Sequence, residues 1–480
     1  MTISMIICLS LTVFFILVFL WDIFQKEHSI LRTYPVFGYL RIIAEHLGIY
    51  LRRYLYSRDR EELPFNRAER IWVYQAAKNA ETLIGFGSTR DLRQLGRIFF
   101  VDVPFPVQTY DSVKTAAVVI GSHTPNPYTT TSIINISAMS YGAISRNAIR
   151  ALGAGAKLAG CWLNTGEGGI SPYHLESGCD LVVQIGTAKY GFRDAAGNLS
   201  DQHLKEAAAL PQVKMFEIKI SQGAKPGKGG ILPAAKVTEE IAVIRGIPAH
   251  QDAVSPNGFT EVTNTSQLID FINHVRDVTC KPTGFKIDIG SPDWLDELWQ
   301  EILNRGIDSA PDFITVDGAE GGSGAAPEVL ASHMGLSIAE SLPMVVDSLN
   351  KHGLRERVKV IAAGKLITPD KVAWALCMGA DFVNTARGFM FALGCVQAMK
   401  CHLNTCPTGI ATHNAWLMRG LDPTNKAVRV YQYAKNMEYE VGIICHSCGV
   451  HEPRELRRHH IRVVTARGTS VSMADVYPET

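Results

Sequence analysis

Three cysteines close together late in the chain are the residues best suited to chemistry. Cys395, Cys401 and Cys406 lie at gaps of six and five residues, and Pro407 follows the last of them. Thiolates crowded in this way in a reducing compartment indicate a metal or iron–sulfur site more than a disulfide framework. Three ligands would suit a three-iron cluster, whereas the plain alternative is three buried cysteines on a helix and its following loop. The spacing alone leaves both interpretations open.

A second candidate site precedes the cysteines, at residues 386–388. This Ala-Arg-Gly turn follows an apolar, strand-like run at 381–385 and precedes a helix-like segment. Backbone N–H groups at the start of a helix are well placed to bind phosphate. Only about two helical turns, roughly 12 Å, separate Arg387 from Cys395. A phosphate-bearing cofactor could therefore lie within electron-transfer distance of a cluster.

The elements that must position these residues are short apolar runs that alternate with helix-like stretches from residue 131 onward. The runs are 133–138, 161–164, 182–185, 215–220, 284–289, 313–316, 358–362 and 382–384. Eight strand–helix units over roughly 270 residues predict an α/β fold, a (β/α)8 TIM barrel. A doubly wound open sheet is the competing interpretation, but no G-x-G-x-x-G opens a helix after the first run.

Glycine-rich segments follow four of these runs, at residues 139–145, 165–169, 221–230 and 317–324. The binding and catalytic residues of a barrel lie at the carboxyl ends of its strands. Glycines at those positions let the backbone approach a flat cofactor and its phosphate closely. Each segment alone is a weak signal, but the four in order predict a cofactor site.

Several motifs resemble those of one known family, the glutamate synthases. The segment G-C-x5-C-H-L-N-T-C-P-x-G at 394–409 resembles the cluster-binding segment of that family. N-T-G-E-G-G at 164–169, E-I-K-I at 217–220 and Q-G-A-K-P-G at 222–227 also match its motifs, in the correct order. The resemblance covers about residues 131–440. It implies that the chain binds FMN, and a [3Fe–4S] cluster through the three cysteines.

FMN needs a phosphate cradle, a wall for the ring, and a cation near N1 and O2. The residues assigned to the phosphate are Gly321, Gly322, Ser323, Gly324, Gly364, Arg387 and Gly388. Those assigned to the ring are Ala138, Met139 and Ser140 as its wall, Asn164 and Gln184 as polar contacts, and Lys219 or Lys286 as the cation. The alternative is that one lysine only pairs with a neighbour such as Glu217 or Asp288. An interior barrel lysine is costly without a partner, so a site role is preferred.

The resemblance also implies a substrate, a 2-oxoacid imine that takes a hydride from the flavin and becomes an amino acid. Lys225 and Arg245 match family positions that bind 2-oxoglutarate, and Glu167, Lys219 and Lys225 are the predicted catalytic residues. Glu167 would handle a proton or orient ammonia. Ile231 stands where the family has the glutamine of G-G-Q-L-P, which leaves the identity of the 2-oxoacid open.

An uncharged, mostly apolar run of 19 residues at 3–21 predicts a transmembrane helix. At 1.5 Å per residue it spans roughly 28 Å, about one hydrocarbon core. No Lys or Arg precedes it, and the basic residues that follow are Lys26, Arg32, Arg41, Arg52 and Arg53. This asymmetry in charge predicts a single-pass protein of the bacterial inner membrane whose catalytic part is cytoplasmic. The basic start and the small-residue cleavage site of a signal peptide are not evident. Residues 30–60, rich in Tyr and Arg, are expected to lie against the bilayer or to clamp the barrel.

The predicted domains are a transmembrane anchor at 1–25, a juxtamembrane and lead-in segment at 26–130, the FMN-binding barrel with its iron–sulfur segment at 131–440, and a tail at 441–480. The formal net charge of +1 and the lack of a basic stripe argue against a nucleic-acid partner. Cys445 and Cys448 form a Cys-x-x-Cys, for which a reduced structural pair is preferred over a metal or redox site.

The sequence therefore predicts a membrane-anchored FMN and iron–sulfur oxidoreductase of the glutamate synthase type that reductively aminates a 2-oxoacid. With no nicotinamide-binding module found in the sequence, electrons are expected from a separate donor such as ferredoxin or a flavoprotein. One alternative is an FMN-dependent amino-acid dehydrogenase that passes electrons to the membrane. Another is a catalytically inactive barrel that scaffolds a membrane complex.

Overall fold

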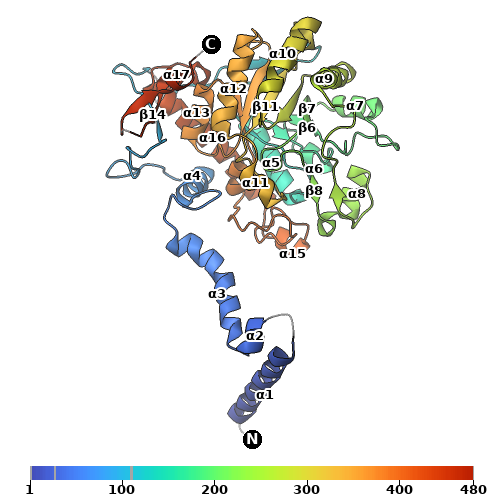
Figure 1. Ribbon diagram of the computed structural model, residues 1–480, viewed down its shortest axis with the longest axis vertical. Coiled ribbons are helices and arrows are strands. Elements are labelled where there is room, and N and C mark those ends of the chain that lie inside the picture. The colour runs from blue at the N-terminus through green and yellow to red at the C-terminus, as the bar shows by residue number, and fades with distance from the viewer. Residues whose placement is uncertain (1–2, 26–28, 109–111, 467, 479–480) are drawn as a thin grey trace. The chain divides into compact units, whose positions relative to one another are not determined.

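A computed structural model describes residues 3–25, 29–108, 112–466 and 468–478 of the chain (Figure 1). The contacts divide the chain into two compact units, Met1–Arg70 and Ile71–Thr480. Lys26, one of the basic residues that follow the predicted membrane helix, lies outside the described residues. The predicted domain boundaries at 25, 130 and 440 stay predictions.

The first unit is helical. Its elements are α1 (Ile3–Phe24), α2 (Ser29–Thr33), α3 (Gly38–Leu51) and a π-helical turn η1 (Arg52–Tyr56). In the described part of the chain, α1 alone is long and apolar enough to cross a membrane, and none of its most apolar window is buried. By length and composition it suits either a membrane span or a signal sequence. Asp22 near its end is buried and accepts hydrogen bonds from the Tyr39 hydroxyl at 3.0 Å and the Val36 N–H at 2.8 Å.

The second unit contains a closed barrel of parallel strands. Around the ring these are β4 (Ile134–Ile136), β5 (Leu163–Asn164), β6 (Leu181–Ile185), β7 (Val213–Lys219), β10 (Thr283–Ile287), β11 (Phe313–Asp317), β12 (Lys359–Ala363) and β13 (Phe382–Thr385). Each of the eight apolar runs contains or overlaps one of these strands. The barrel closes because β13 pairs with β4, Val383 opposite Ile134. The (β/α)8 prediction is confirmed, and the open doubly wound sheet is excluded.

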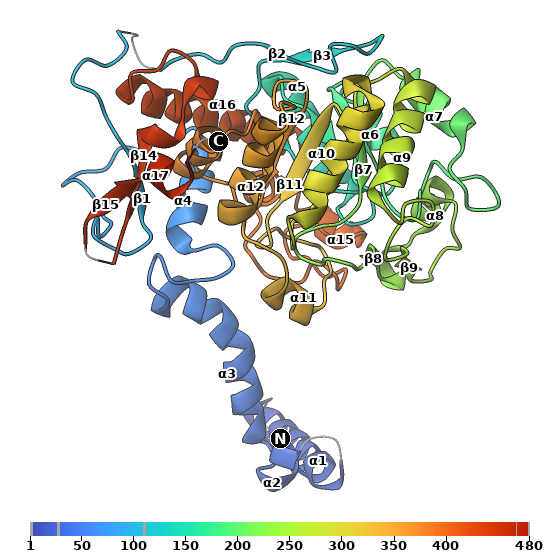
Figure 2. The ribbon, with the colours of Figure 1, turned by 45° about the horizontal axis from the view of Figure 1, so that its top comes forward.

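Helices surround the barrel (Figure 2). They are α5 (Arg146–Ala159), α6 (Pro172–Leu175), α7 (Asp201–Ala208), α8 (Glu239–Arg245), α9 (Thr265–Thr279), α10 (Asp293–Arg305), α11 (Glu328–His333), α12 (Ile338–Lys351), α13 (Pro369–Cys377), α14 (Arg387–Ala392), α15 (Ala415–Met418) and α16 (Pro423–Ser447). A further helix, α17 (Met473–Val476), packs on β14 (Ile461–Val464) and β15 (Ser470–Ser472). α5 begins where the Ser145 hydroxyl caps the Ala148 N–H, and it ends at Gly160 in the left-handed conformation. α16 packs closely on α5, since a Cβ on Gly155 would lie 2.4 Å from Val430.

Residues before and after the barrel form one small sheet. β1 (Ile98–Phe100) pairs antiparallel with β14 (Ile461–Val464), which pairs with β15 (Ser470–Ser472). A separate hairpin of β2 (Val118–Ile120) and β3 (Tyr128–Thr130) packs Ile120 and Tyr128 into the core beside Trp162. The lead-in segment and the carboxyl-terminal tail therefore fold together with the barrel. α4 (Arg67–Ala77) joins this arrangement through Trp72, whose indole N–H donates to Glu440 at 3.0 Å.

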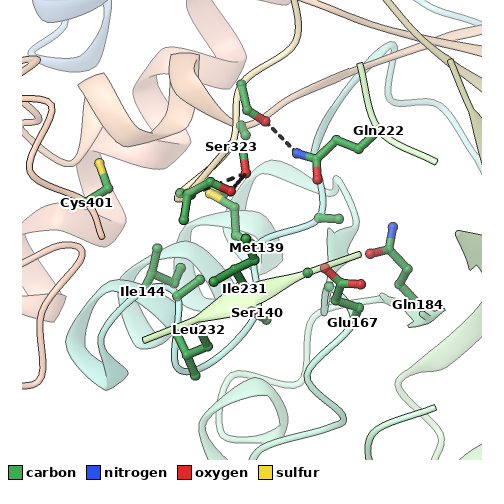
Figure 3. Close-up of a pocket in the computed structure, with 18 of the residues that line it drawn as sticks. Met139, Ser140, Ile144, Glu167, Gln184, Gln222, Ile231, Leu232, Ser323 and Cys401 are labelled. Atoms are coloured by element: carbon green, nitrogen blue, oxygen red, sulfur yellow. Dashed lines mark hydrogen bonds between the residues drawn. The ribbon is translucent and has the colours of Figure 1, made fainter. Parts of the chain in front are cut away.

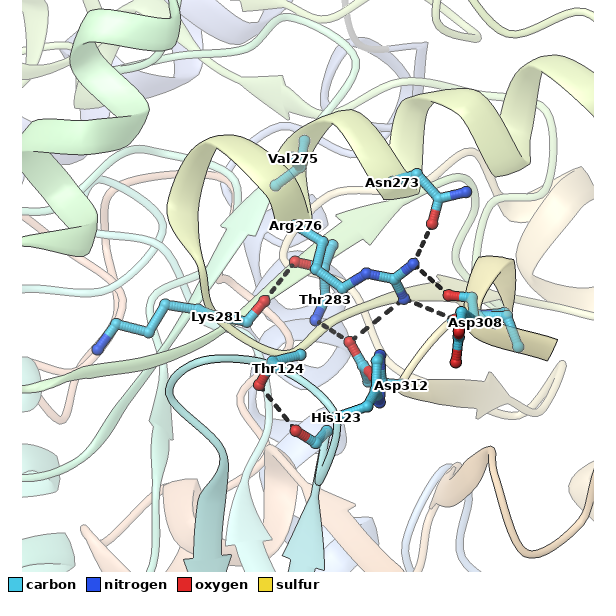
Figure 4. A network of polar contacts seen from close by, with 12 residues as sticks. His123, Thr124, Asn273, Val275, Arg276, Lys281, Thr283, Asp308 and Asp312 are labelled. Atoms are coloured by element: carbon cyan, nitrogen blue, oxygen red, sulfur yellow. Dashed lines mark hydrogen bonds and ion pairs between the residues drawn. The ribbon is translucent and has the colours of Figure 1, made fainter. Parts of the chain in front are cut away.

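A buried network closes the amino ends of β10 and β11 (Figure 4). The Asp312 carboxylate is fully buried and accepts the Thr283 N–H at 2.8 Å. It also pairs with Arg357 at 3.0 Å and Arg276 at 3.7 Å, and His123 lies 3.3 Å away. Burial lowers the pKa of His123, although Asp312 opposes this shift. Because this end of a barrel lies opposite its catalytic end, the network stabilises the fold.

We expect Asp312→Asn to lower the free energy of unfolding by about 3 kcal/mol, because the amide leaves buried guanidinium groups unpaired. Urea denaturation followed by circular dichroism measures the change. The matched control is Asp296→Asn, which makes the same change at a pair with Lys351 on the surface of α10. Exposed pairs contribute little. Equal denaturation midpoints for the two variants would contradict a stabilising role for Asp312.

Candidate active site

A pocket lies at the carboxyl ends of the barrel strands (Figure 3). The predicted site residues that line it are Ala138, Met139, Ser140, Glu167, Gln184, Lys219, Lys225, Arg245, Lys286, Gly322, Ser323, Gly324, Arg387 and Cys401. Those that do not are Asn164, Gly321, Gly364, Gly388, Cys395 and Cys406. The fold thus brings most of the predicted residues to one place, while the role of each stays a prediction.

An ion pair between Glu167 and Lys219 lies in the pocket wall. The Lys219 ammonium, at the end of β7, is 2.7 Å from the carboxylate of Glu167, which follows β5. Burial raises the pKa of Glu167, but the charges of Lys219 and Lys225 oppose it, so that the pKa is lowered overall. A Cβ on either Gly186 or Gly230 would lie 2.5 Å from a Glu167 carboxylate oxygen. Glycine at both positions therefore makes the space for an ionised, partly buried carboxylate.

A second buried pair joins Lys286 on β10 to Asp317 on β11, at 3.4 Å. Burial lowers the pKa of Lys286, but the charges of Asp317 and Glu217 outweigh it and raise the pKa overall. Asp317 also accepts the Gly223 N–H at 3.0 Å. The closest carboxylates of the two barrel lysines are therefore neither Glu217 nor Asp288, the neighbours considered from the sequence.

Glu217 is instead the acceptor of a polar network inside the barrel. Its carboxylate accepts hydrogen bonds from the Asn164 amide at 2.8 Å, the Gln184 amide at 2.7 Å and the Thr315 hydroxyl at 2.6 Å. All four side chains are buried. Asn164, assigned to the flavin ring from sequence, thus has its amide nitrogen turned towards the interior of the barrel.

Two further cations in the pocket have no carboxylate partner within 4.0 Å among the described residues. The Lys225 ammonium donates to the Ala325 carbonyl at 3.4 Å, and burial together with repulsion from Lys219 lowers its pKa to about 8. Arg245, at the end of α8, donates to the Ser140 hydroxyl at 3.2 Å and the Tyr141 carbonyl at 3.0 Å. Both side chains are therefore available to an anionic ligand.

Arg387 lies between the glycine loop after β11 and the cysteine segment. Its guanidinium donates to the Ser323 carbonyl at 2.7 Å and is 3.8 Å from the Cys401 sulfur. A Cβ on Gly322 would lie 3.0 Å from Arg387 Nε, so that glycine allows this approach. Gly388 has a different role, because a Cβ there would lie 2.2 Å from the Tyr433 hydroxyl on α16. Gly364 follows β12 with a φ of +138°.

The three predicted cluster cysteines have different surroundings. The Cys395 sulfur accepts the Gln397 N–H at 3.4 Å, and burial raises its pKa to about 11. Burial also raises the pKa of Cys406, but hydrogen bonds from Thr408 and from backbone N–H groups that follow lower it overall. Within the described ranges, no three His, Cys, Asp or Glu side chains are placed to hold a metal ion. All ten cysteines are free thiols, Cys445 and Cys448 included.

Contacts that the sequence analysis missed hold the cysteine segment in place. The Lys236 ammonium, on the 3₁₀ turn η2 (Ala234–Lys236), donates to the Ala143 carbonyl at 2.5 Å and the Cys401 carbonyl at 3.1 Å. The Asn404 amide donates to the Ala235 carbonyl at 2.9 Å, and His413 Nε2 lies 2.8 Å from the Gly142 carbonyl. No spacing in the sequence marks these residues, because their partners are more than 90 residues away.

Comparison with known proteins places these features in a family context. Residues 107–451 match the model described as a conserved region in glutamate synthase. A glutamate synthase large subunit-like protein of Bacillus subtilis is 39% identical over 94% of this chain and 92% of its own length. An archaeal-type glutamate synthase (NADPH) of Thermotoga maritima is 32% identical over 68% of this chain, which spans 61% of that relative's length. A solved mandelate oxidase structure overlaps with a TM-score of 0.49 at 16% identity, covering 83% of this chain and 99% of the other.

Proposed function

The chain belongs to the glutamate synthase family, and from this premise we propose that it is an FMN and iron–sulfur oxidoreductase that reductively aminates a 2-oxoacid. The observation that carries the proposal is the grouping of an ionised Glu167, its partner Lys219 and the two cations Lys225 and Arg245 around one pocket. A carboxylate, an ammonium and anion-binding groups are what amination of a 2-oxoacid requires. The NADPH named for some relatives belongs to those proteins, and the donor here is proposed to be a ferredoxin or a flavoprotein.

The pocket fits FMN at two places. Gly322, Ser323 and Gly324 lie beside Arg387, whose guanidinium donates to the Ser323 carbonyl. Together they would make a cradle in which this guanidinium binds a phosphate. Buried ammonium groups, Lys219 and Lys286, lie at the mouth of the barrel, where a cation would stabilise a reduced anionic flavin. When bound, FMN supplies the hydride for the reaction.

The side chains of the pocket would perform the remaining chemistry. A 2-oxoacid and ammonia form an imine with loss of water, and the imine carbon then takes a hydride and its nitrogen a proton. Lys225 and Arg245 bind the substrate carboxylate. Glu167, held by Lys219, orients ammonia and passes the proton that leaves nitrogen to the oxygen that departs as water when the imine forms. Lys219 holds the proton that the substrate nitrogen takes up when the imine is reduced to the amine.

We also propose that Cys395, Cys401 and Cys406 bind a [3Fe–4S] cluster, which supplies one-electron transfer from the donor. The support is the sequence spacing, together with the hydrogen bond from the Gln397 N–H to the Cys395 sulfur and the contact of the Cys406 sulfur with the Thr408 hydroxyl, although burial raises the pKa of Cys395. The sulfur atoms as they lie in the structure do not form a metal site. The proposal therefore requires the segment between Cys395 and Cys406 to close around the metal.

The function is tested by anaerobic photoreduction of the purified protein followed by addition of 2-oxoacids with ammonium. The wild-type flavin should be reoxidised, and Glu167→Gln should slow this step by about 100-fold or more, because a general base is lost. The matched control is Glu176→Gln on the surface of the barrel, which should behave as wild type. Glu176 pairs with Arg150 there. Flavin that stays reduced with every 2-oxoacid, yet is reduced by amino acids when oxidised, would favour the dehydrogenase alternative.

We propose that α1 spans a membrane, with the barrel on the cytoplasmic side. The support is its mean hydropathy of 2.9, its exposed apolar side chains and the basic residues after it, Arg32 and Arg41 among them. Deletion of residues 1–25 should move the protein from the membrane pellet to the soluble fraction. Deletion of residues 2–6 is the control and should leave the protein in the pellet, because the 18 residues of α1 that remain, 7–24, still suit a membrane span. Sedimentation of the longer deletion with membranes would instead assign anchoring to residues 30–60.

A further inference from the structure

We propose that the 2-oxoacid of this protein carries an apolar, branched aliphatic side chain in place of a second carboxylate. Ile231 and Leu232 are the residues that select it. The inference rests on the proposed function, whose substrate class it specifies. It follows from the composition of one wall of the pocket and from the polar groups that remain available there.

The apolar wall is built on a short two-stranded ribbon. β8 (Ile231–Leu232) pairs antiparallel with β9 (Ala253–Val254), with Ile231 opposite Val254. The Ser255 N–H donates to the Gly230 carbonyl at 2.8 Å and extends this pairing. Ile144 completes the wall from the segment after β4, and Figure 3 draws all three apolar side chains around the pocket. Backbone pairing therefore holds the apolar residues in position.

This wall lies between the groups that would bind and react with the substrate. A Cβ on Gly142 would lie 3.0 Å from both Leu232 Cδ2 and Arg245 Nη2, so these two side chains are neighbours. A Cβ on Gly230 would lie 2.5 Å from a Glu167 carboxylate oxygen, so β8 begins beside that carboxylate. A substrate carboxylate at Arg245 and a reacting carbon near Glu167 would place the substrate side chain against Ile231 and Leu232.

The polar groups of the pocket leave one position for a carboxylate. Lys219 and Lys286 pair with Glu167 and Asp317, and the Gln222 amide donates to the Gly322 carbonyl at 2.6 Å. Arg387 also lines the pocket without a carboxylate partner among the described residues, but it lies at the cradle assigned to the phosphate. Lys225 and Arg245 remain to hold the α-carboxylate together. A second carboxylate laid on this wall would lose its water without gaining a donor, whereas an aliphatic side chain gains from burial.

The test compares the binding of 2-oxo-4-methylpentanoate and 2-oxoglutarate by isothermal titration calorimetry. We expect the wild-type protein to bind the branched acid at least about tenfold more tightly. Ile231→Gln should narrow or reverse this ratio of the two affinities. Because Ile231 is partly exposed, the protein should tolerate the polar side chain. The matched control is Val254→Gln, the same change at the exposed cross-strand partner outside the pocket, which should keep the ratio.

Failure of the inference differs from failure of the proposed reaction. Tighter binding of 2-oxoglutarate to the wild-type protein, or an unchanged ratio in Ile231→Gln, would overturn the inference. Preferential reoxidation of the reduced flavin by 2-oxoglutarate with ammonium would overturn it too, while supporting the reaction. Preferential binding of the branched acid without any reoxidation would support the pocket specificity and reject the amination. Binding of neither acid would reject both.

Discussion

Replacement of Arg387 by glutamate is expected to remove most of the bound flavin. Arg387 is half-buried beside Gly322 and Ser323, and its guanidinium would face the FMN phosphate. A charge-assisted hydrogen bond to a charged group contributes about 1.5–3 kcal/mol, and the reversed charge adds repulsion to its loss. We therefore expect the affinity for FMN to fall by at least about 100-fold. Absorbance at the flavin band, measured per protein after gel filtration, reports the loss.

Graded substitutions separate this electrostatic effect from misfolding. Arg387→Lys should retain part of the flavin because it keeps the charge but loses the fork of donors, and Arg387→Gln should be intermediate. The control is Arg150→Glu on α5, which makes the same charge reversal at an exposed ion pair, with Glu176 at the end of α6. The unfolding midpoint of each flavin-free variant shows whether the barrel is intact. Full flavin content in a folded Arg387→Glu protein would remove Arg387 from the phosphate site.

Serine at Cys395, Cys401 or Cys406 is expected to remove the iron of the proposed cluster. Each thiolate would supply one of the three protein ligands, so loss of any one should abolish stable binding. Cys401 should also affect the flavin, because its sulfur lies 3.8 Å from the Arg387 guanidinium. Iron and sulfide analysis with low-temperature EPR of the oxidised protein provides the measurement, in anaerobically prepared wild type and in each variant.

Two other cysteines provide controls for the cluster. Cys448→Ser at the end of α16 and Cys280→Ser at the end of α9 should leave iron and sulfide unchanged, since neither residue belongs to the 395–406 segment. The backbone of the segment is strained at Gln397 and Met399, because both have positive φ, a costly conformation for these side chains. Asn404 also has positive φ, which asparagine tolerates. Wild-type protein with full FMN and no iron would contradict the cluster and leave cysteines that only pack.

The barrel could be predicted from the sequence because its signals are local. Apolar runs such as 182–185 and 313–316 became β6 (Leu181–Ile185) and β11 (Phe313–Asp317), since buried parallel strands require continuous apolar residues. Once eight such strands close, their carboxyl ends must meet at one mouth. Most residues predicted for the site follow a strand, and they line one pocket for that reason.

Only the tertiary structure decided how the polar residues of that mouth pair. Glu217 and Lys219 are two residues apart on β7 and project to the same side, so the strand period cannot separate them. The two side chains differ in their depth along the barrel. Glu217 accepts hydrogen bonds from Asn164 and Gln184 in the interior, while Lys219 donates to Glu167 in the pocket. The layer in which a side chain lies depends on the stagger between strands, which no single strand encodes.

The same limit applies to the residues outside the strands. Sequence alone determined the barrel, the cysteine spacing and the apolar α1, because the pattern that predicts each of them involves residues close together in the chain. The contact of Lys236 with Cys401 and the position of Leu232 beside Arg245 are made by segments that meet only after the barrel has closed. Long-range contacts of this kind carry no periodic signal in either partner, so the fold had to bring them together before their chemistry could be inferred.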